Sequence, residues 1–427
     1  MGNYNYLNNV EAINKAYEIA EEVYSSFGIN IEDVFEKMKH IPVSLHCWQG
    51  DDINGFEKGA QGLSGGGILV TGNYMGRARN GEELRMDLDE ALSLIPGTHR
   101  VNLHAIYAET GDEFVDRDEI LPEYFTKWMD WASQKGIGLD FNPSYFSHPY
   151  AVNGTLSSTN TTERNFWIKH GRKCRDIAAA MGMATKKTCI NNIWIHDGSK
   201  DLPADRMERR KILIDALDEV LEIKYSPSSL KDAVESKLFG IGSESYVTGS
   251  HEFYMGYALS RGIMLCLDMG HFHPTESIAD KVSSILLFTD ELLLHVSRGI
   301  RWDSDHVVIL NDDIAALAFE AKRCDAFGRL HFALDYFDAS INRITAWVIG
   351  ARAFLKAVLQ SLLEPSHLLV ESEKAGRLGD RLALMEEFKA LPHAAIWNKY
   401  CLDMNVPVGP AWLTNIMEYE DKILSKR

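Results

Sequence analysis

Five side chains from two nearby segments, LDMGHFHP and LLLHVSRGIRWDSDHVV, could bind a metal ion or move protons. They are Asp268, His271, His295, Asp303 and Asp305. Asp303 and Asp305 form a D-x-D pair, and residue alternation places both carboxylates on one side of an extended segment. Asp268 and His271 stand three residues apart at the end of one apolar run, and His295 ends the next. This pattern is typical of a metal-binding rim.

Glu235 and Asp335 end two further apolar runs and would bring the set to five carboxylates and two imidazoles. So much negative charge in one place is unfavourable unless cations neutralise it. Oxygen and imidazole ligands suit Mn²⁺, Mg²⁺, Co²⁺ or Zn²⁺, and the excess of oxygen favours Mn²⁺ or Mg²⁺. Seven donors are too many for one tetrahedral ion, so the sequence predicts two divalent ions. A hydrogen-bonded surface network is the alternative, because each short motif alone occurs by chance.

Four other side chains lie near the ends of strand-like runs, and each has a functional and a structural interpretation. Lys237, two residues after Glu235, could polarise a substrate oxygen or simply form an ion pair with Glu235. Trp48 and Trp194 could form an apolar wall for a sugar, or belong to the core. His104 could position or protonate a ring oxygen, although taken alone it favours a structural role.

Eight β-branched and aromatic runs alternate with helix-sized amphipathic segments and would position these side chains. The runs cover residues 41–48, 99–107, 136–142, 187–197, 232–240, 262–271, 292–298 and 330–338. Eight strands, each followed by a crossover, predict an α/β fold of the closed (β/α)8 TIM-barrel type, in which all strand ends converge on one face. A doubly wound open sheet has the same alternation and stays open as an alternative.

The two ends of the chain show only helical patterns. Apolar residues recur at three- and four-residue steps from Val10 to Phe27, with Gly28 at the expected stop. We therefore expect N-terminal helices in residues 1–40, the barrel in 41–345 and a helical C-terminal extension in 346–427.

Composition excludes several classes of protein. The 427 residues hold 44 Lys and Arg against 61 Asp and Glu, a net charge of −17 that argues against a nucleic-acid partner. No stretch reaches the roughly 18 apolar residues of a membrane span, and the N-terminus has no secretory pattern. Six scattered cysteines predict reduced thiols in a cytoplasmic protein.

A two-metal rim on a barrel could hydrolyse phosphoesters or amides, or isomerise aldoses and ketoses. Hydrolysis of nucleic acid would need a basic groove, which the charge balance does not favour. Isomerisation needs metal ions that act as Lewis acids on the C1 and C2 oxygens, so that hydride can move between these carbons. A two-metal hydrolase of the endonuclease type is the alternative enzyme. A sugar- or metal-binding protein without turnover is less favoured, because binding alone would not require Lys237 and the D-x-D pair.

Six segments carry a resemblance to a known family. They are SLHCWQGDDINGFE, NNIWIHDGSKD, DAVESKLFGIGSESY, LDMGHFHPTE, LLLHVSRGIRWDSDHVV and LDYFDASINRI. The chain resembles bacterial L-rhamnose isomerase over essentially its whole length. The resemblance implies a metal-dependent barrel that interconverts L-rhamnose and L-rhamnulose in the first step of rhamnose catabolism. It also implies a cytoplasmic homotetramer that uses Mn²⁺.

The resemblance also implies roles for individual residues. The catalytic-metal ligands fall on His271, Asp303 and Asp305, and the structural-metal ligands on Glu235, Asp268, His295 and Asp335, with Asp268 as a possible bridge. Two divalent ions per subunit are expected, with Co²⁺, Mg²⁺ or Zn²⁺ as alternatives to Mn²⁺ at one site. The expected catalytic residues are Lys237, Asp335 and His104. The expected substrate-binding residues are Trp48, Trp194, Lys237 and Tyr107.

Overall fold

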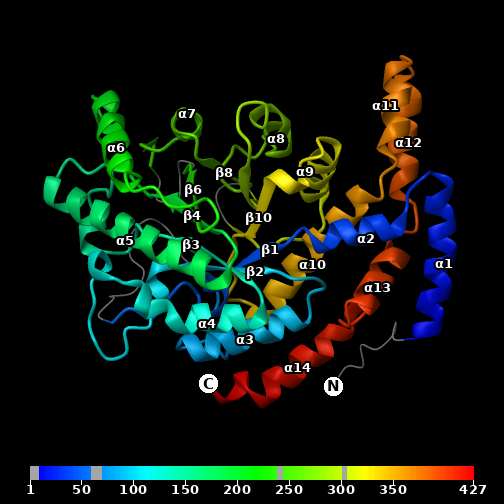
Figure 1. Ribbon diagram of the computed structural model, residues 1–427, viewed down its shortest axis with the longest axis horizontal. Coiled ribbons are helices and arrows are strands. Elements are labelled where there is room, and N and C mark those ends of the chain that lie inside the picture. Colours follow the sequence, from blue (N-terminus) through cyan, green and yellow to red (C-terminus); the bar gives the residue numbers. More distant parts are fainter. Residues whose placement is uncertain (1–8, 59–69, 238–243, 301–304) are drawn as a thin grey trace.

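The computed structural model describes residues 9–58, 70–237, 244–300 and 305–427 (Figure 1). Eight parallel strands form a closed barrel in the order β1-β10-β9-β8-β6-β4-β3-β2. Their bounds are β1 (Val43–His46), β2 (Arg100–His104), β3 (Gly138–Asn142), β4 (Cys189–Trp194), β6 (Leu230–Glu235), β8 (Met264–Asp268), β9 (Leu292–His295) and β10 (Leu330–Leu334). Every strand overlaps one of the predicted runs, so the (β/α)8 prediction is confirmed and the open sheet is excluded.

Helices that follow the strands along the chain surround the barrel. They are α3 (Gly81–Ser93), α4 (Thr126–Lys135), α5 (Thr161–Thr185), α6 (Arg206–Val220), α7 (His251–Arg261), α8 (Ala279–Ile285), α9 (Asp312–Arg323) and α10 (Arg343–Leu362). Side chains of asparagine cap several of their first turns; Asn342, for example, accepts from the backbone N–H groups of Ile344 and Thr345. Helix α4 ends at Gly136, whose φ of +67° is the left-handed conformation that glycine adopts most easily.

Short elements complete the architecture. An antiparallel pair, β5 (Gly198–Ser199) and β7 (Tyr246–Val247), lies outside the barrel. Short 3₁₀ helices are η1 (Cys47–Gly50), η2 (Ala105–Tyr107), η3 (Arg117–Glu119), η4 (Pro122–Phe125), η5 (Pro149–Ala151), η6 (Phe327–Arg329), η7 (Gly409–Ala411) and η8 (Leu424–Lys426). Helices η1 and η2 directly follow β1 and β2, and they carry Trp48 and Tyr107.

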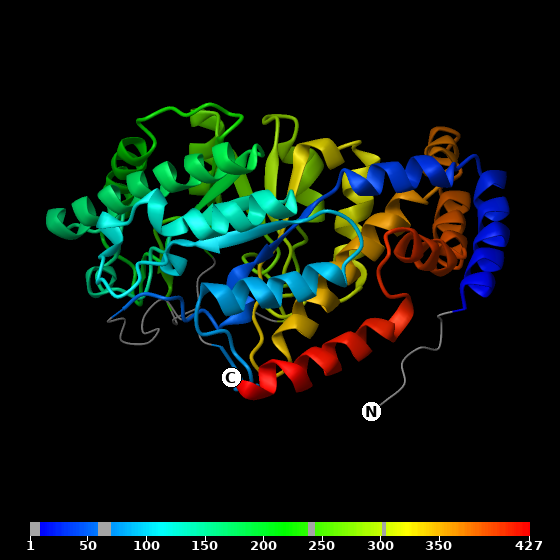
Figure 2. The same ribbon diagram turned by 60° about the horizontal axis from the view of Figure 1, so that its bottom comes forward.

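Helices at both ends of the chain pack together beside the barrel. The N-terminal pair is α1 (Val10–Ser26) and α2 (Ile31–Lys39), and the C-terminal set is α11 (Ser366–Lys374), α12 (Leu378–Lys389), α13 (His393–Asp403) and α14 (Trp412–Lys422). Helices α1 and α13 lie side by side in both ribbon views (Figures 1 and 2). The side chains of Tyr419 and Arg427 bind Asp87 and so attach the C-terminal end to α3.

The predicted division between residues 345 and 346 falls inside α10, which is buried along most of its length. The indole of Trp347 on α10 donates to the backbone oxygen of His46, at 2.9 Å, and so ties this helix to the end of β1. The three-part division into domains stays a prediction.

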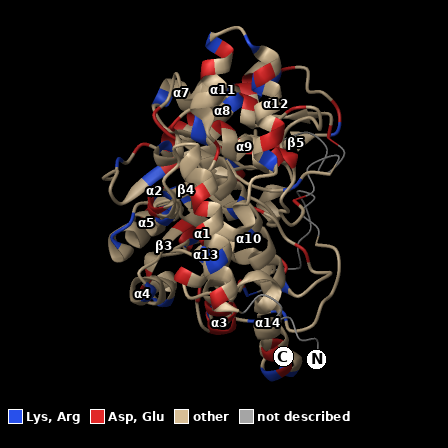
Figure 3. Ribbon diagram, turned by 90° about the vertical axis from the view of Figure 1, so that its right-hand side faces the viewer, with Lys and Arg blue, Asp and Glu red and all other residues tan. Residues whose placement is uncertain are grey.

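The helices and the distribution of charge bear on whether the protein could contact a membrane or a nucleic acid. Among the described residues, no single helix is long and apolar enough to cross a membrane, and α10 and α11 meet that criterion only as a pair bent by 51°. On the side of the molecule that Figure 3 shows, basic and acidic residues are mixed.

Candidate metal centre

Four side chains from four neighbouring strands meet at the carboxyl end of the barrel. Glu235, Asp268 and His295 are the last residues of β6, β8 and β9, and Asp335 directly follows β10. One ligand atom from each lies within 4.8 Å of the others, and all four residues are buried. We call these four residues the carboxylate–histidine cluster. They are the four that the family resemblance assigned to one ion.

The imidazole of His295 is surrounded by the three carboxylates of the cluster. Its Nδ1 lies 3.0 Å from Oδ2 of Asp335, 3.3 Å from Oε1 of Glu235 and 3.5 Å from Oδ2 of Asp268. A single ring N–H can donate fully to only one of them. The carboxylates that do not receive this N–H therefore lie close to one another without enough hydrogen-bond donors in the cluster to satisfy their oxygens.

Several buried polar atoms of the cluster have no hydrogen-bond partner in the described part of the chain, and a divalent cation could bind them. Among the described residues, Oε1 of Glu235, Oδ2 of Asp268, Oδ1 of Asp335 and both ring nitrogens of His295 are buried without a hydrogen-bond partner. Buried ionisable groups are costly unless they are paired or bind a metal. Three carboxylates and one imidazole are a donor set that Mn²⁺, Co²⁺ or Zn²⁺ accepts. The arrangement supports the predicted metal site over the alternative of a surface hydrogen-bond network.

Ionisation within the cluster is strongly perturbed. Burial raises the pKa of Asp335 to about 6, despite the opposing effect of His295. Burial opposes the charge of Glu235 as well, but His295 and His271 outweigh it and lower the pKa of that carboxyl. Burial also opposes protonation of His295, yet Cys266, Glu235 and Asp335 raise its pKa well above the usual value. The cluster thus has a negative potential that favours a bound positive charge.

His271 and Asp305 lie next to the cluster. Nδ1 of His271 is 3.1 Å from Oε1 of Glu235. A Cβ on Gly270 would lie 3.2 Å from an oxygen of Asp268 and 3.2 Å from one of Asp305, so the missing side chain lets these carboxylates approach. Asp305 has a φ of +33°, in the left-handed region that non-glycine residues adopt infrequently. The prediction for Asp303 lies outside the described residues.

The predicted aromatic wall is buried and stacked. The rings of Trp48 and His104 are parallel within 20°, with centroids 4.1 Å apart. Tyr107 is completely buried, and its hydroxyl donates to Oδ1 of Asp51 at 2.5 Å. Burial lowers the pKa of His104 to about 3, and the nearby His295 adds to this effect, so the imidazole is neutral. The role of these three side chains toward a substrate stays a prediction.

Lys237 is buried beside the cluster and has an acidic partner. Its Nζ donates to the backbone oxygen of His196 at 3.0 Å and to Oε1 of Glu244 at 2.6 Å. The ion pair is thus formed with Glu244, where the sequence had suggested Glu235 as the partner. Trp194, at the end of β4, is half-buried and packs edge-on against Phe146.

Three neighbours of the cluster were not predicted as site residues. Nδ1 of His46 lies 3.2 Å from Oδ1 of Asp335, and its ring centroid is 5.1 Å from that of His295. Asn192 donates to Oε2 of Glu235, and Ser297 donates to Oδ1 of Asp268. The signal for His46 was its position at a strand end, which it shares with the predicted ligands.

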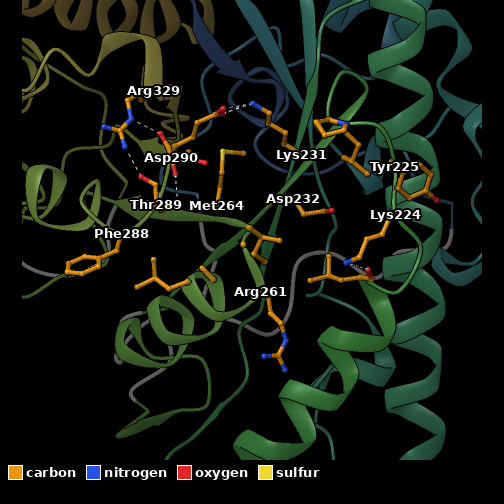
Figure 4. Close-up of a pocket in the computed structure, with 18 of the residues that line it drawn as sticks. Lys224, Tyr225, Lys231, Asp232, Arg261, Met264, Phe288, Thr289, Asp290 and Arg329 are labelled. Carbon is orange, nitrogen blue, oxygen red and sulfur yellow. Dashed lines mark hydrogen bonds and ion pairs between the residues drawn. The ribbon is translucent and has the colours of Figure 1, made fainter.

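A separate cavity lies at the other end of the barrel. It has a volume of about 710 Å³ and is lined by Lys231 and Asp232 near the start of β6 and by Met264 at the start of β8 (Figure 4). Lys231 there binds Glu291. None of the predicted site residues lines this cavity, so it is distinct from the metal centre.

Comparisons with known proteins identify similar chains. Residues 11–427 match the family described as L-rhamnose isomerase (RhaA). The L-rhamnose isomerase of Rhodopirellula baltica is 55% identical over 422 residues, which cover 99% of this chain and 98% of that protein. The L-rhamnose isomerase of Mannheimia succiniciproducens is 53% identical over 98% of this chain and 100% of that protein. A solved L-ribulose 3-epimerase has a TM-score of 0.49 and 12% identity, over 77% of this chain and 97% of that one.

Proposed function

The chain belongs to the L-rhamnose isomerase family, and from this premise we propose that the carboxylate–histidine cluster holds a divalent ion of an aldose–ketose isomerase site. The enzyme interconverts L-rhamnose and L-rhamnulose. One observation carries the metal assignment: four buried donor atoms from four strand ends lie within 4.8 Å of one another.

A second ion would be held by His271 and Asp305, together with Asp303 and with Asp268 as the bridge. The short distance from His271 to Glu235 and the approach of Asp305 to Asp268 at Gly270 support this proposal. The excess of carboxylate ligands favours Mn²⁺, with Co²⁺, Mg²⁺ or Zn²⁺ as alternatives at one site.

The residues around the cluster would bind and orient an open-chain sugar. A bound divalent cation supplies Lewis acidity toward the adjacent C1 and C2 oxygens, which favours a hydride shift between these carbons. Lys237 would donate through Nζ to a substrate oxygen, and Glu244 holds that ammonium in place. Trp48 and Trp194 would exclude water, while Asp335 and His104 would accept or return the hydroxyl proton.

The experiment that tests this function follows an isotope through the reaction. L-Rhamnose carrying deuterium at C2 is converted by the Mn²⁺-loaded protein, and the ketose is analysed by NMR. We expect most of the label at C1. Complete loss of the label to solvent would indicate an enediol route with a protein base. Failure to form ketose from L-rhamnose with any of the four metals would contradict the function itself.

Assembly and compartment are further parts of the proposal. We propose a homotetramer, which light scattering on the purified protein would test. Helix α12 has no buried residue, and it exposes Leu378 and Leu382, which supports contact between copies. We also propose a cytoplasmic location without a nucleic-acid or membrane partner. The six unpaired cysteines and the net charge of −17 support it.

A further inference from the structure

Two amide side chains lie directly beneath the cluster, inside the barrel. Asn192 on β4 places Nδ2 at 2.5 Å from Oε2 of Glu235. Asn102 on β2 places Nδ2 at 3.0 Å from Nε2 of His46. Both asparagines are at most 2% exposed. Each amide therefore binds the cluster, or its immediate neighbour, from the side opposite to the strand ends.

The other end of each amide has no partner. Oδ1 of Asn102 and Oδ1 of Asn192 are buried and make no hydrogen bond with a described residue. A buried amide oxygen without a partner is unfavourable, and native proteins seldom keep one without a use. Both asparagines line a cavity of about 280 Å³, together with apolar residues such as Leu293 and Ala333 and polar ones such as Asp140.

The Asn192 amide fixes the rotation of the Glu235 carboxylate. Since Oε2 accepts a hydrogen bond from Asn192, the carboxylate is held in one orientation, with Oε1 pointing away from Asn192. That oxygen lies 3.1 Å from Nδ1 of His271 and 3.3 Å from Nδ1 of His295. The oxygen available to a metal ion is therefore selected by a group that does not itself bind the ion.

The Asn102 amide favours one tautomer of His46. An amide NH₂ only donates, so Nε2 of His46 accepts in this orientation of the amide, which favours the tautomer with the ring proton on Nδ1. Nδ1 forms a hydrogen bond with Nε2 of His104 at 3.4 Å and also lies 3.2 Å from Oδ1 of Asp335. The other carboxylate oxygen of Asp335 lies 3.0 Å from His295. Asn102 thus orients the His46 ring, whose Nδ1 lies close to Asp335.

We propose that Asn102 and Asn192 are positioning residues for the metal-binding carboxylates Asp335 and Glu235. The inference rests on the proposed function, because it presumes that the cluster binds a divalent ion. Asn192 directs its NH₂ group toward Glu235 and Asn102 directs its NH₂ group toward His46, while the oxygen of each amide makes no hydrogen bond with a described residue.

The test compares metal affinity with stability in two leucine variants. Asn192→Leu and Asn102→Leu remove the donor and keep a similar volume beside a cavity of about 280 Å³ that both asparagines line. Calorimetric titration with Mn²⁺ should show affinity weakened about 10- to 100-fold in each variant. The melting temperature of the metal-free variants should stay close to that of the parent protein, because leucine has a volume similar to that of asparagine and the site borders a cavity. The visible spectrum of bound Co²⁺ should also shift, because the ligand geometry changes.

Ser44→Ala is the matched control. Ser44 lines the same cavity from β1, but its hydroxyl donates to Asp140 and not to the cluster. This variant should bind Mn²⁺ as the parent does.

Three outcomes would contradict the inference, and a fourth would contradict the proposed function instead. Parental affinity in both leucine variants contradicts it, and so does a loss of affinity that merely follows a lowered melting temperature. If a leucine variant does not fold, Asn192→Asp keeps the shape and turns an acceptor toward Glu235; unchanged Mn²⁺ affinity in that variant also contradicts the inference. If the parent protein binds no divalent ion, it is the proposed function that fails.

Discussion

Nδ1 of His295 lies 3.0 Å from Oδ2 of Asp335, and this contact follows from the register of two neighbouring strands. His295 pairs with Ala333 across β9 and β10. Asp335 comes two residues after Ala333 and therefore projects into the barrel on the same side. On the other side, His295 pairs with Asp268 of β8. The carboxylate–histidine cluster is thus assembled by strand register, with each of its residues supplied by a different strand end.

His271→Ala should abolish isomerisation while the fold persists. His271 lies beside Glu235 at the edge of the cluster, and its loss would remove one ligand of the proposed second ion. We expect turnover to fall by a factor of about 100 or more, since removal of a single group that stabilises the transition state commonly has this effect. Ketose formation measures the activity, and far-UV circular dichroism checks the fold.

His273→Ala is the control for this variant. His273 is exposed, and its Nδ1 contacts only its near neighbour Thr275 among the bonds described. Its substitution should leave turnover within a factor of about two, as surface substitutions usually do. Equal losses in both variants would contradict the assignment of His271.

The strands were predictable because their residues carry a local signal. Each barrel strand is a short, mostly apolar run with a polar residue at or just beyond its carboxyl end, and these ends meet because parallel strands of a barrel point the same way. Glu235, Asp268, His295 and Asp335 could therefore be expected at one face before any contact was known. The resemblance to the family then distinguished ligands from other polar strand ends.

Other features depend on contacts between distant segments. His46 ends its strand like the ligands do, but only the closed barrel shows it beside Asp335. The partner of Lys237 is Glu244, which lies beyond the undescribed residues 238–243, so strand alternation could not identify it. Helix α10 crosses the predicted boundary at residue 345 because Trp347 packs against the end of β1.

Removal of divalent ions should destabilise the protein and abolish its activity. Without a cation, the three carboxylates of the cluster repel one another around His295. At a Mn²⁺ concentration of about 100 times the dissociation constant, binding would add about 2.7 kcal/mol to the free energy of unfolding. Thermal melts after chelation and after addition of Mn²⁺ measure this effect. A melting temperature and an activity that do not change after chelation would refute metal dependence.

The free energy of unfolding should depend on pH through Asp51. Burial raises the pKa of this carboxyl to about 7, against hydrogen bonds from Tyr107 and Gly55 that lower it. The folded state therefore keeps a proton that the unfolded state loses near its ordinary pKa of 3.8. Stability must fall as pH rises from about 4 to about 7 and then level off, because the unfolded state binds fewer protons in this range.

Asp51→Asn should lack this part of the pH dependence. The difference in unfolding free energy between variant and parent should change by up to about 4 kcal/mol over the range, which is the full equivalent of the pKa shift. Urea unfolding between pH 4 and pH 8 measures it. Asp112→Asn is the control, because Asp112 is exposed and pairs only with the side chain of Lys58 among the described contacts. Parallel curves for Asp51→Asn and the parent would contradict the prediction.

Lys237→Met should reduce turnover more than it reduces stability. The substitution keeps the apolar stem and removes the ammonium that Glu244 and the His196 carbonyl hold beside the cluster. If this ammonium stabilises charge on a substrate oxygen, kcat should fall by a factor of about 100 to 1,000. Glu244→Gln keeps a hydrogen-bond acceptor for Nζ but removes the charge, so its effect on kcat should be smaller and in the same direction.

Lys231→Met is the control, because Lys231 lies on the same strand β6 but at the opposite end of the barrel, paired with Glu291. Measurement of kcat and KM for all variants separates the outcomes. A change in KM alone would mean that Lys237 only binds the sugar. An unchanged kcat in Lys237→Met would therefore show that Lys237 is not a catalytic residue.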